Sequence, residues 1–251
     1  MLLICMYHHV GEGPYSNRLA ILRDHLLFLK QNYRNVLPGE ELPEDRDSVC
    51  LTFDDAPFNF FHDVFPLLQD LKLRAIVGVP TRFILEKTGL SSDIRLQVSY
   101  DQIMTGNVYE EKAPFCTWEE LRQMVLSGFV VVASHSHNHV NMSEKDTDVA
   151  FEITRSKQII EEQLQTKVTT FIYPFGKLSR GVHERVAQEY SYAMRIGNAL
   201  NKKWEGLLYR VNADNLTDAK QLLFKRNLAH YWLKGLRNNL LKPNGFYPWS
   251  G

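Results

Sequence analysis

Short apolar runs alternate with longer amphipathic stretches along most of the chain. The apolar runs have the length and the β-branched and aromatic content of buried strands, and they cover residues 2–7, 49–53, 74–80, 129–133, 168–173, 192–196 and 207–211. Helical spacing of apolar residues separates most of them, at residues 19–31, 60–71, 117–127, 146–165 and 179–190. Repeated strand–helix units with continuously apolar strands indicate a parallel sheet covered by helices. We therefore predict an α/β fold, a single distorted TIM-like (β/α) barrel with about seven parallel strands.

Two segments depart from this alternation. Residues 82–116 are polar and irregular, and such long loops inside a compact domain are usually functional or disordered. We interpret them as an insertion, either a substrate lid or a mobile loop. Residues 217–241 have the spacing of one helix with an apolar face, which predicts a C-terminal helix docked on the barrel. The length of 251 residues suits one such barrel, so residues 1–251 are expected to form a single domain.

The composition argues against two classes of partner. Lys plus Arg and Asp plus Glu each total 29, so the chain has no net positive field to attract nucleic acid or an anionic membrane. No apolar segment approaches the roughly 20 residues of a membrane span. The three cysteines, Cys5, Cys50 and Cys116, lack the spacing of a disulfide framework, and no leader-like segment opens the chain. Buried free thiols and a cytoplasmic location are expected.

Acids and histidines are concentrated directly after two of the predicted strands. Asp54 and Asp55 end one apolar run, and His135, His137 and His139 follow another. The carboxyl ends of barrel strands meet on one face, where such folds carry their chemistry. An open zinc-type site needs about three protein ligands and one position for water, with a further carboxylate as general base. These residues supply that set.

Spacing divides the tasks between these residues. Adjacent side chains of an extended chain point in opposite directions, so we expect one of Asp54 and Asp55 to bind metal and the other to handle protons. His135 and His139 flank a short polar turn and can converge on one ion. Taken alone, the two aspartates could belong to a polar turn that starts a helix. The three histidines, taken alone, could belong to a solvated loop. The two motifs together, both at strand ends, favour the metal site.

These residues resemble the polysaccharide deacetylases, which are the NodB-homology or carbohydrate esterase family 4 enzymes. The motifs T-F-D-D-G, H-[S/T]-x-x-H and P-[Y/F]-G are matched by Thr52-Phe53-Asp54-Asp55 with Ala56 in place of the glycine, by His135-Ser136-His137-Asn138-His139, and by Tyr173-Pro174-Phe175-Gly176. The opening Met6-Tyr7-His8-His9-Val10 is similar to a subgroup that includes the poly-N-acetylglucosamine deacetylases. The resemblance extends over most of the chain.

The resemblance implies a role for each matched residue. Asp54 is the catalytic base, and Asp55, His135 and His139 bind one divalent metal ion. Zinc is the expected metal, although Co²⁺, Ni²⁺ or Fe²⁺ also suit nitrogen and oxygen ligands. The third motif, Tyr173, Pro174, Phe175 and Gly176, is expected to contact the substrate or stabilise the oxyanion. The implied reaction removes the N-acetyl group from an N-acetylated sugar or glycan precursor and releases acetate.

Two departures from the family pattern affect the acid and base groups. The arginine that normally opens the third motif is replaced by Ile172, and we expect Arg210 to support Asp54 in its place. The alternative is that Arg210 is an ordinary surface arginine on the rim of the barrel. In the family, a late L-x-H motif on a strand supplies the general acid. Its only match here is Leu228-Ala229-His230, which lies in a helical stretch. The general acid therefore stays open among His8, His9, His137 and His230.

Two other functions are compatible with these motifs. A related amidohydrolase would keep the metal and the base but act on a C–N bond outside sugars. A catalytically degenerate barrel would bind glycans without cleaving them, which the replacement by Ile172 and the missing strand-borne L-x-H would explain. Retention of Asp54 with all three ligands argues against the degenerate barrel. The sequence does not specify the sugar, its linkage or the oligomeric state.

Overall fold

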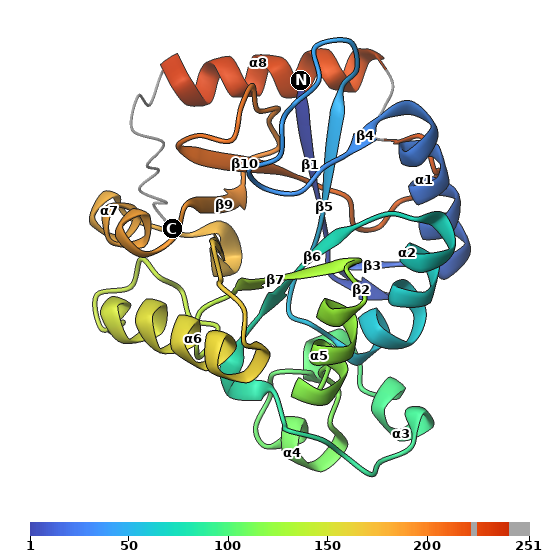
Figure 1. Ribbon diagram of the computed structural model, residues 1–251, viewed down its shortest axis with the longest axis vertical. Helices are drawn as coiled ribbons and strands as arrows, with labels where there is room; N and C mark the ends of the chain where they lie inside the picture. Colours follow the sequence, from blue (N-terminus) through green and yellow to red (C-terminus); the bar gives the residue numbers. More distant parts are fainter. Residues whose placement is uncertain (222–224, 241–251) are drawn as a thin grey trace.

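The computed structural model describes residues 1–221 and 225–240. In this part of the chain, seven parallel strands form a closed barrel (Figure 1): β1 (Leu2–Tyr7), β5 (Ser48–Phe53), β6 (Ala75–Val79), β7 (Val130–Ser134), β8 (Thr170–Ile172), β9 (Tyr192–Ile196) and β10 (Leu207–Asn212). The strand order is β1-β10-β9-β8-β7-β6-β5, and the pairing of β1 with β5 closes the ring. The predicted barrel of about seven parallel strands is confirmed.

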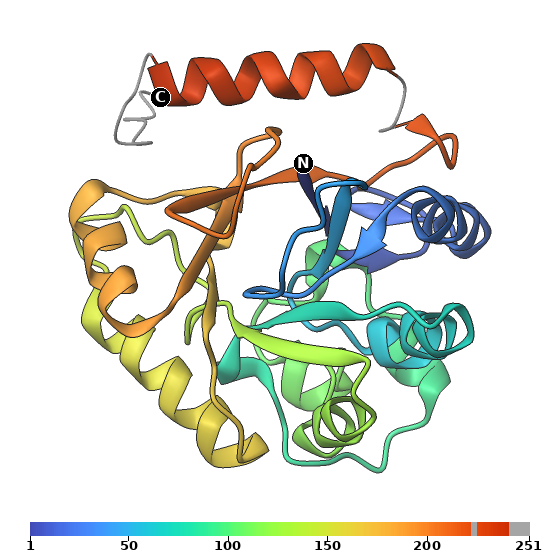
Figure 2. The same ribbon diagram turned by 45° about the horizontal axis from the view of Figure 1, so that its top comes forward.

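Helices cover the outside of the barrel (Figure 2). They are α1 (Leu19–Asn32), the π-helical turn η1 (Phe60–Val64) with α2 (Phe65–Leu71), α5 (Trp118–Leu126), α6 (Val149–Leu164) and α7 (Arg180–Glu189). The start of α5 is fixed by a capping box, in which the Thr117 hydroxyl accepts from the Glu120 amide and the Glu120 carboxylate accepts from the Thr117 amide. Each predicted helix in this region is present within a few residues of its expected ends.

Alternation along the strands divides the core into two layers. Leu3, Cys5 and Tyr7 of β1 point outward and pack with the helices, whereas Leu2 and Ile4 point into the barrel. Inward residues of the other strands complete the inner layer: Cys50, Ile76, Ala133, Ile172, Met194 and Leu208. Polar residues with the same inward parity are therefore brought together where the strands end.

The shortest elements of the structure were not predicted from the sequence. The two-residue strand β4 (Arg34–Asn35) pairs with β5, and β2 (His9–Val10) pairs with β3 (Ser16–Asn17) above the end of β1. The segment at residues 82–116 is only partly irregular, because it contains α3 (Ser92–Leu96), the 3₁₀ turn η3 (Tyr100–Gln102) and α4 (Val108–Lys112). A further 3₁₀ turn, η2 (Thr81–Phe83), overlaps the start of this segment. Elements of two to five residues are too short to show periodicity.

The C-terminal helix lies beside the N-terminus (Figures 1 and 2). It is α8 (Lys225–Leu240), shorter than the predicted span of 217–241. Gly235 faces the barrel, where the Leu200 carbonyl would lie 3.6 Å from an added Cβ, whereas Trp232 and Leu233 are largely exposed. Three leucines that would contribute to the expected apolar face cannot be placed on it, because Leu222, Leu223 and the Leu228 side chain lie outside the described residues. The helix thus covers the amino ends of the strands.

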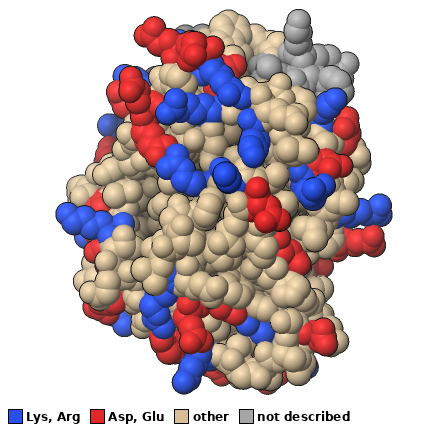
Figure 3. All heavy atoms as spheres, turned by 45° about the vertical axis from the view of Figure 1, so that its right-hand side comes forward, with Lys and Arg blue, Asp and Glu red and all other residues tan. Residues whose placement is uncertain are grey.

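The surface carries both signs of charge. In the view of Figure 3, basic and acidic side chains are interspersed around a band of uncharged residues, in agreement with the formal net charge of +0. Cys5, Cys50 and Cys116 are buried free thiols, as expected. Within the described residues, no helix combines the length and the apolar character needed to cross a membrane. The single domain over residues 1–251 stays a prediction.

Candidate metal centre

The two adjacent aspartates leave β5 in different directions. Asp54 continues the inward parity of Cys50 and Thr52, and its amide donates to the Tyr7 carbonyl at 2.8 Å. The chain then turns through Asp55 and Ala56, whose φ angles are +68° and +48°. Left-handed backbone costs a residue with a Cβ roughly 1–2 kcal/mol, which explains why the family motif has glycine at the position of Ala56. The turn separates the two carboxylates.

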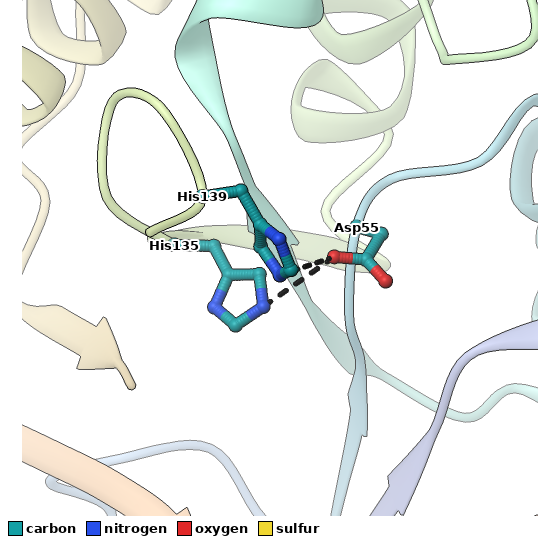
Figure 4. A group of neighbouring side chains, drawn as sticks. All are labelled: Asp55, His135 and His139. Atoms are coloured by element: carbon teal, nitrogen blue, oxygen red, sulfur yellow. Dashed lines mark ion pairs between the residues drawn. The ribbon is translucent and has the colours of Figure 1, made fainter. Parts of the chain in front are cut away.

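Asp55, His135 and His139 form a compact group at the carboxyl ends of β5 and β7 (Figure 4). The Asp55 Oδ1 atom lies 3.4 Å from His135 Nε2 and 3.2 Å from His139 Nε2. The three ligand atoms lie within 4.8 Å of one another. Two ligands of a tetrahedral zinc ion are about 3.4 Å apart, given metal–ligand bonds near 2.1 Å, so these separations fit one cation.

Hydrogen bonding around this group also fits a cation. Asp55 Oδ1 is buried without a hydrogen-bond partner, a costly state for a carboxylate oxygen unless a cation binds it. His135 Nδ1 donates to the Ile172 carbonyl at 2.9 Å, which orients the ring with Nε2 toward Asp55. Burial favours the neutral form of Asp55, but the two imidazoles outweigh it and hold the Asp55 pKa well below its usual value.

Asp54 is excluded from this group and has its own partner. Arg210 on β10 donates to Asp54 Oδ1 at 2.6 Å and to Oδ2 at 2.8 Å, and also to the Thr52 hydroxyl at 3.1 Å. Arg210 is fully buried, contrary to an exposed role on the rim. Burial opposes ionisation of Asp54, but the charge of Arg210, helped by His135 and the hydrogen bond, lowers the Asp54 pKa. Arg210 therefore contacts Asp54 directly, and its role as support for a catalytic base stays a prediction.

His8 is the histidine that the structure brings to Asp54. Its Nε2 atom lies 3.7 Å from Asp54 Oδ2, and its Nδ1 atom lies 2.7 Å from Asp214 Oδ2. The other Asp214 oxygen accepts from the His8 amide at 3.0 Å. Burial lowers the His8 pKa, but the hydrogen bond and charge of Asp214, with the charges of Asp54 and Asp55, raise it to about 9. His8 is therefore protonated at neutral pH.

The other histidine candidates have different surroundings. His137 Nδ1 pairs with the Thr81 hydroxyl at 2.8 Å, and the His137 ring packs edge-on against Phe151. His230 is exposed on α8, the helix beside the N-terminus, whereas the candidate metal centre lies at the carboxyl ends of the strands. The His9 ring, like that of His8, packs edge-on against Tyr100. Burial lowers the pKa of His9. Neither His137 nor His230 is placed to reach Asp54.

The third motif borders the metal group through one residue. The Phe175 side chain is 57% exposed, and its ring centroid lies 4.8 Å from that of His139. Tyr173 is buried, with its amide donating to the Met194 carbonyl and its hydroxyl 2.9 Å from His183 Nδ1. Pro174 and Gly176 are buried, and Gly176 packs against Ile196. Phe175 is thus the residue of this motif that is exposed beside the candidate metal ligands.

Two residues that contact the site were not predicted from the sequence. Asp214 follows β10 by two residues, and Tyr100 of the insertion donates its hydroxyl to Asp55 Oδ2 at 3.1 Å. An acid just past a predicted strand end was the available signal for Asp214. No local pattern distinguishes Tyr100 from other tyrosines, because its contact spans 45 positions.

Fold and site together define an α/β-barrel protein with a candidate metal centre of aspartate and histidine ligands. The chain matches the polysaccharide deacetylase family model over residues 41–194. The chain therefore belongs to the polysaccharide deacetylase family.

Individual relatives agree with this assignment. The chain is 29% identical over 136 residues to the poly-β-1,6-N-acetyl-D-glucosamine N-deacetylase of Escherichia coli K12, a match that covers 49% of this chain and 18% of the relative. The chain thus spans about a fifth of that relative's length. The Streptococcus pyogenes deacetylase PplD in complex with acetate has a TM-score of 0.69 at 19% identity, covering 92% of this chain and 97% of that one. IcaB from Ammonifex degensii has a TM-score of 0.68 at 19% identity, covering 92% and 96%. These structures share the fold.

Proposed function

We propose that this protein is a metal-dependent hydrolase that removes N-acetyl groups from an N-acetylated sugar or glycan. The observation that carries the proposal is the division of the two aspartates, with Asp55 facing two histidines and Asp54 held separately by Arg210. Amide hydrolysis needs both a cation and a proton acceptor beside it. Membership of the polysaccharide deacetylase family supports acetamide as the bond cleaved.

One divalent cation would be held by Asp55, His135 and His139. When bound, it would polarise the acetamide carbonyl and make an attacking water more acidic. Two imidazoles and one carboxylate suit Zn²⁺ best among common metals, with Co²⁺, Ni²⁺ and Fe²⁺ as alternatives.

Asp54 is the proposed general base. Its lowered pKa keeps it ionised at neutral pH, so it can accept the proton of the attacking water. Arg210 fixes both carboxylate oxygens and thereby sets the direction from which the proton arrives. An arginine on β10 thus does what the family arginine at the position of Ile172 would do.

His8 is the proposed general acid. Asp214 orients its ring through Nδ1, which leaves Nε2 directed toward the Asp54 side of the site. A protonated imidazole there can donate to the nitrogen of the leaving amine. The pair of His8 and Asp214 would thus take the role expected of a late L-x-H motif.

Phe175 is the proposed substrate contact. Its exposed ring beside His139 offers a face for a sugar, and its amide is the candidate oxyanion donor because the Tyr173 amide already donates to Met194. The E. coli relative is named for poly-β-1,6-N-acetyl-D-glucosamine, so oligomers of that glycan are the first substrates to test. The cytoplasmic location and the lid role of residues 82–116 stay proposals.

The decisive experiment measures acetate. Purified zinc-loaded protein is incubated with N-acetylglucosamine and its β-1,6 oligomers, and acetate and free amine are quantified beside the Asp54→Asn variant. Acetate release by the wild type alone supports the proposal. No acetate together with turnover of a ureide or imide would favour the amidohydrolase, and sugar binding without turnover would favour the degenerate barrel.

A further inference from the structure

The insertion between β6 and α5 is bonded directly to the turn that carries Asp55. Its last residues run antiparallel to the segment after Asp55, with the Phe58 amide donating to the Pro114 carbonyl at 2.7 Å. The Cys116 amide donates to the Ala56 carbonyl at 2.8 Å. The insertion therefore supports the backbone one residue beyond the candidate metal ligand.

A buried arginine fixes the middle of the insertion. Arg95 is 5% exposed and binds both oxygens of Glu120, at 2.6 and 2.9 Å. It also donates to the carbonyls of Ala113 and Phe115, each at 2.8 Å, and its guanidinium lies 3.5 Å from the centre of the Phe58 ring. Because Glu120 caps α5, these contacts join the insertion to a helix of the barrel wall. The segment around Tyr100 is thus held from both sides.

Tyr100 divides the two oxygens of Asp55 between different partners. Oδ1 faces His135 and His139, whereas Oδ2 accepts the Tyr100 hydroxyl at 3.1 Å. The Tyr100 ring is held in place by Tyr15, with ring centroids 5.2 Å apart, and by His8 at 5.8 Å. A carboxylate with one oxygen occupied in this way presents the other oxygen to a cation in a fixed orientation.

We propose that Tyr100 is a positioning residue that fixes Asp55 as a single-oxygen metal ligand. The inference rests on the proposed metal site and makes the insertion part of that site. Hydrogen-bond partners of metal ligands typically change metal affinity by about 10–100-fold when removed. Loss of the hydroxyl frees Asp55 to rotate or to offer both oxygens, which weakens binding and alters the coordination geometry.

The test compares two tyrosines of the same insertion. Tyr100→Phe removes the hydroxyl and keeps the ring, whereas Tyr109→Phe removes a hydroxyl that donates to the exposed Glu110 carboxylate. Zinc affinity of the full chain is measured by competition with a chromophoric chelator, and the visible absorption spectrum of the Co²⁺-loaded protein reports ligand geometry. Circular dichroism of the metal-free variants checks folding.

Tyr100→Phe is expected to bind zinc about 10–100-fold more weakly, with a changed Co²⁺ spectrum, while Tyr109→Phe matches the wild type. Wild-type affinity and an unchanged Co²⁺ spectrum in Tyr100→Phe would overturn the inference and leave the metal site intact. Absence of zinc binding by the wild type would instead remove the proposed function, and this inference with it.

Discussion

Arg210 binds both carboxylate oxygens of Asp54 across 156 positions of sequence. The interior of a closed barrel is shared by inward residues of every strand, so a guanidinium can reach the same carboxylate from β10 or from β8. Here the β8 position holds Ile172, whose Cδ1 lies 3.3 Å from where a Cβ on Gly78 would stand. Ile172 fills the β8 side of the barrel interior, and Arg210 brings the positive charge to Asp54 from β10.

The metal ligands can be tested by stoichiometry. His135→Ala and His139→Ala should each lose the bound divalent ion, because both imidazoles face Asp55 Oδ1. His137→Ala is the matched control and should keep it, since the His137 ring pairs with Thr81. Elemental analysis of the zinc-loaded proteins measures the result. Full occupancy in both ligand variants would move the site elsewhere.

The base can be tested without disturbing the metal. Asp54→Asn should retain stoichiometric zinc yet release acetate about 10²-fold more slowly or worse, the scale of a lost proton acceptor. Metal content and turnover are measured on the same preparation. Near-normal turnover by the loaded variant would remove Asp54 from the mechanism.

Arg210 should matter for stability as well as rate. Arg210→Met leaves the Asp54 carboxylate buried without its partner, which costs about 3–5 kcal/mol. The Asp54 pKa is lowered in the folded protein, so the pair's stabilisation is present above the unfolded pKa and is lost as pH falls through the folded pKa. In Arg210→Met the acidic limb of activity should move to higher pH.

Urea unfolding and a pH–rate profile measure both effects. Arg210→Lys keeps a charge without the paired donors and should fall between wild type and Arg210→Met. Equal unfolding free energies for wild type and Arg210→Met would contradict the role assigned to the pair.

The alkaline limb of the pH–rate profile should depend on Asp214. The His8 pKa is raised to about 9, so the protonated acid persists below that pH and is lost above it. Asp214→Asn removes the charge that raises the His8 pKa and leaves only a weaker amide acceptor for Nδ1, so the His8 pKa falls. The alkaline limb should shift to lower pH, while Asp218→Asn, an exposed acid after the same strand, should leave it unchanged. An unshifted limb in Asp214→Asn would exclude His8 as the titrating acid.

The sequence predicted what is local and missed what is distant. Buried parallel strands are apolar throughout, so the seven barrel strands were recognisable one by one. Asp55, His135 and His139 belong to two short motifs whose spacing brings ligands together. Asp214 and Tyr100 meet the site only through folding, over 206 positions from Asp214 to His8 and 45 from Tyr100 to Asp55. The two-residue strands β2, β3 and β4 were too short to show a pattern.

The candidate metal ligands come early in the sequence, whereas the partners of the proposed base and acid come from β10 and the residues just after it. All three candidate metal ligands lie between residues 55 and 139, after strands that precede the last third of the chain. Arg210 and Asp214 reach Asp54 and His8 only once β10 has inserted between β1 and β9. A chain that stops before β10 would contain every ligand and still lack both partners of its proton-transfer groups. Ring closure is therefore the event that would convert a metal-binding protein into an enzyme.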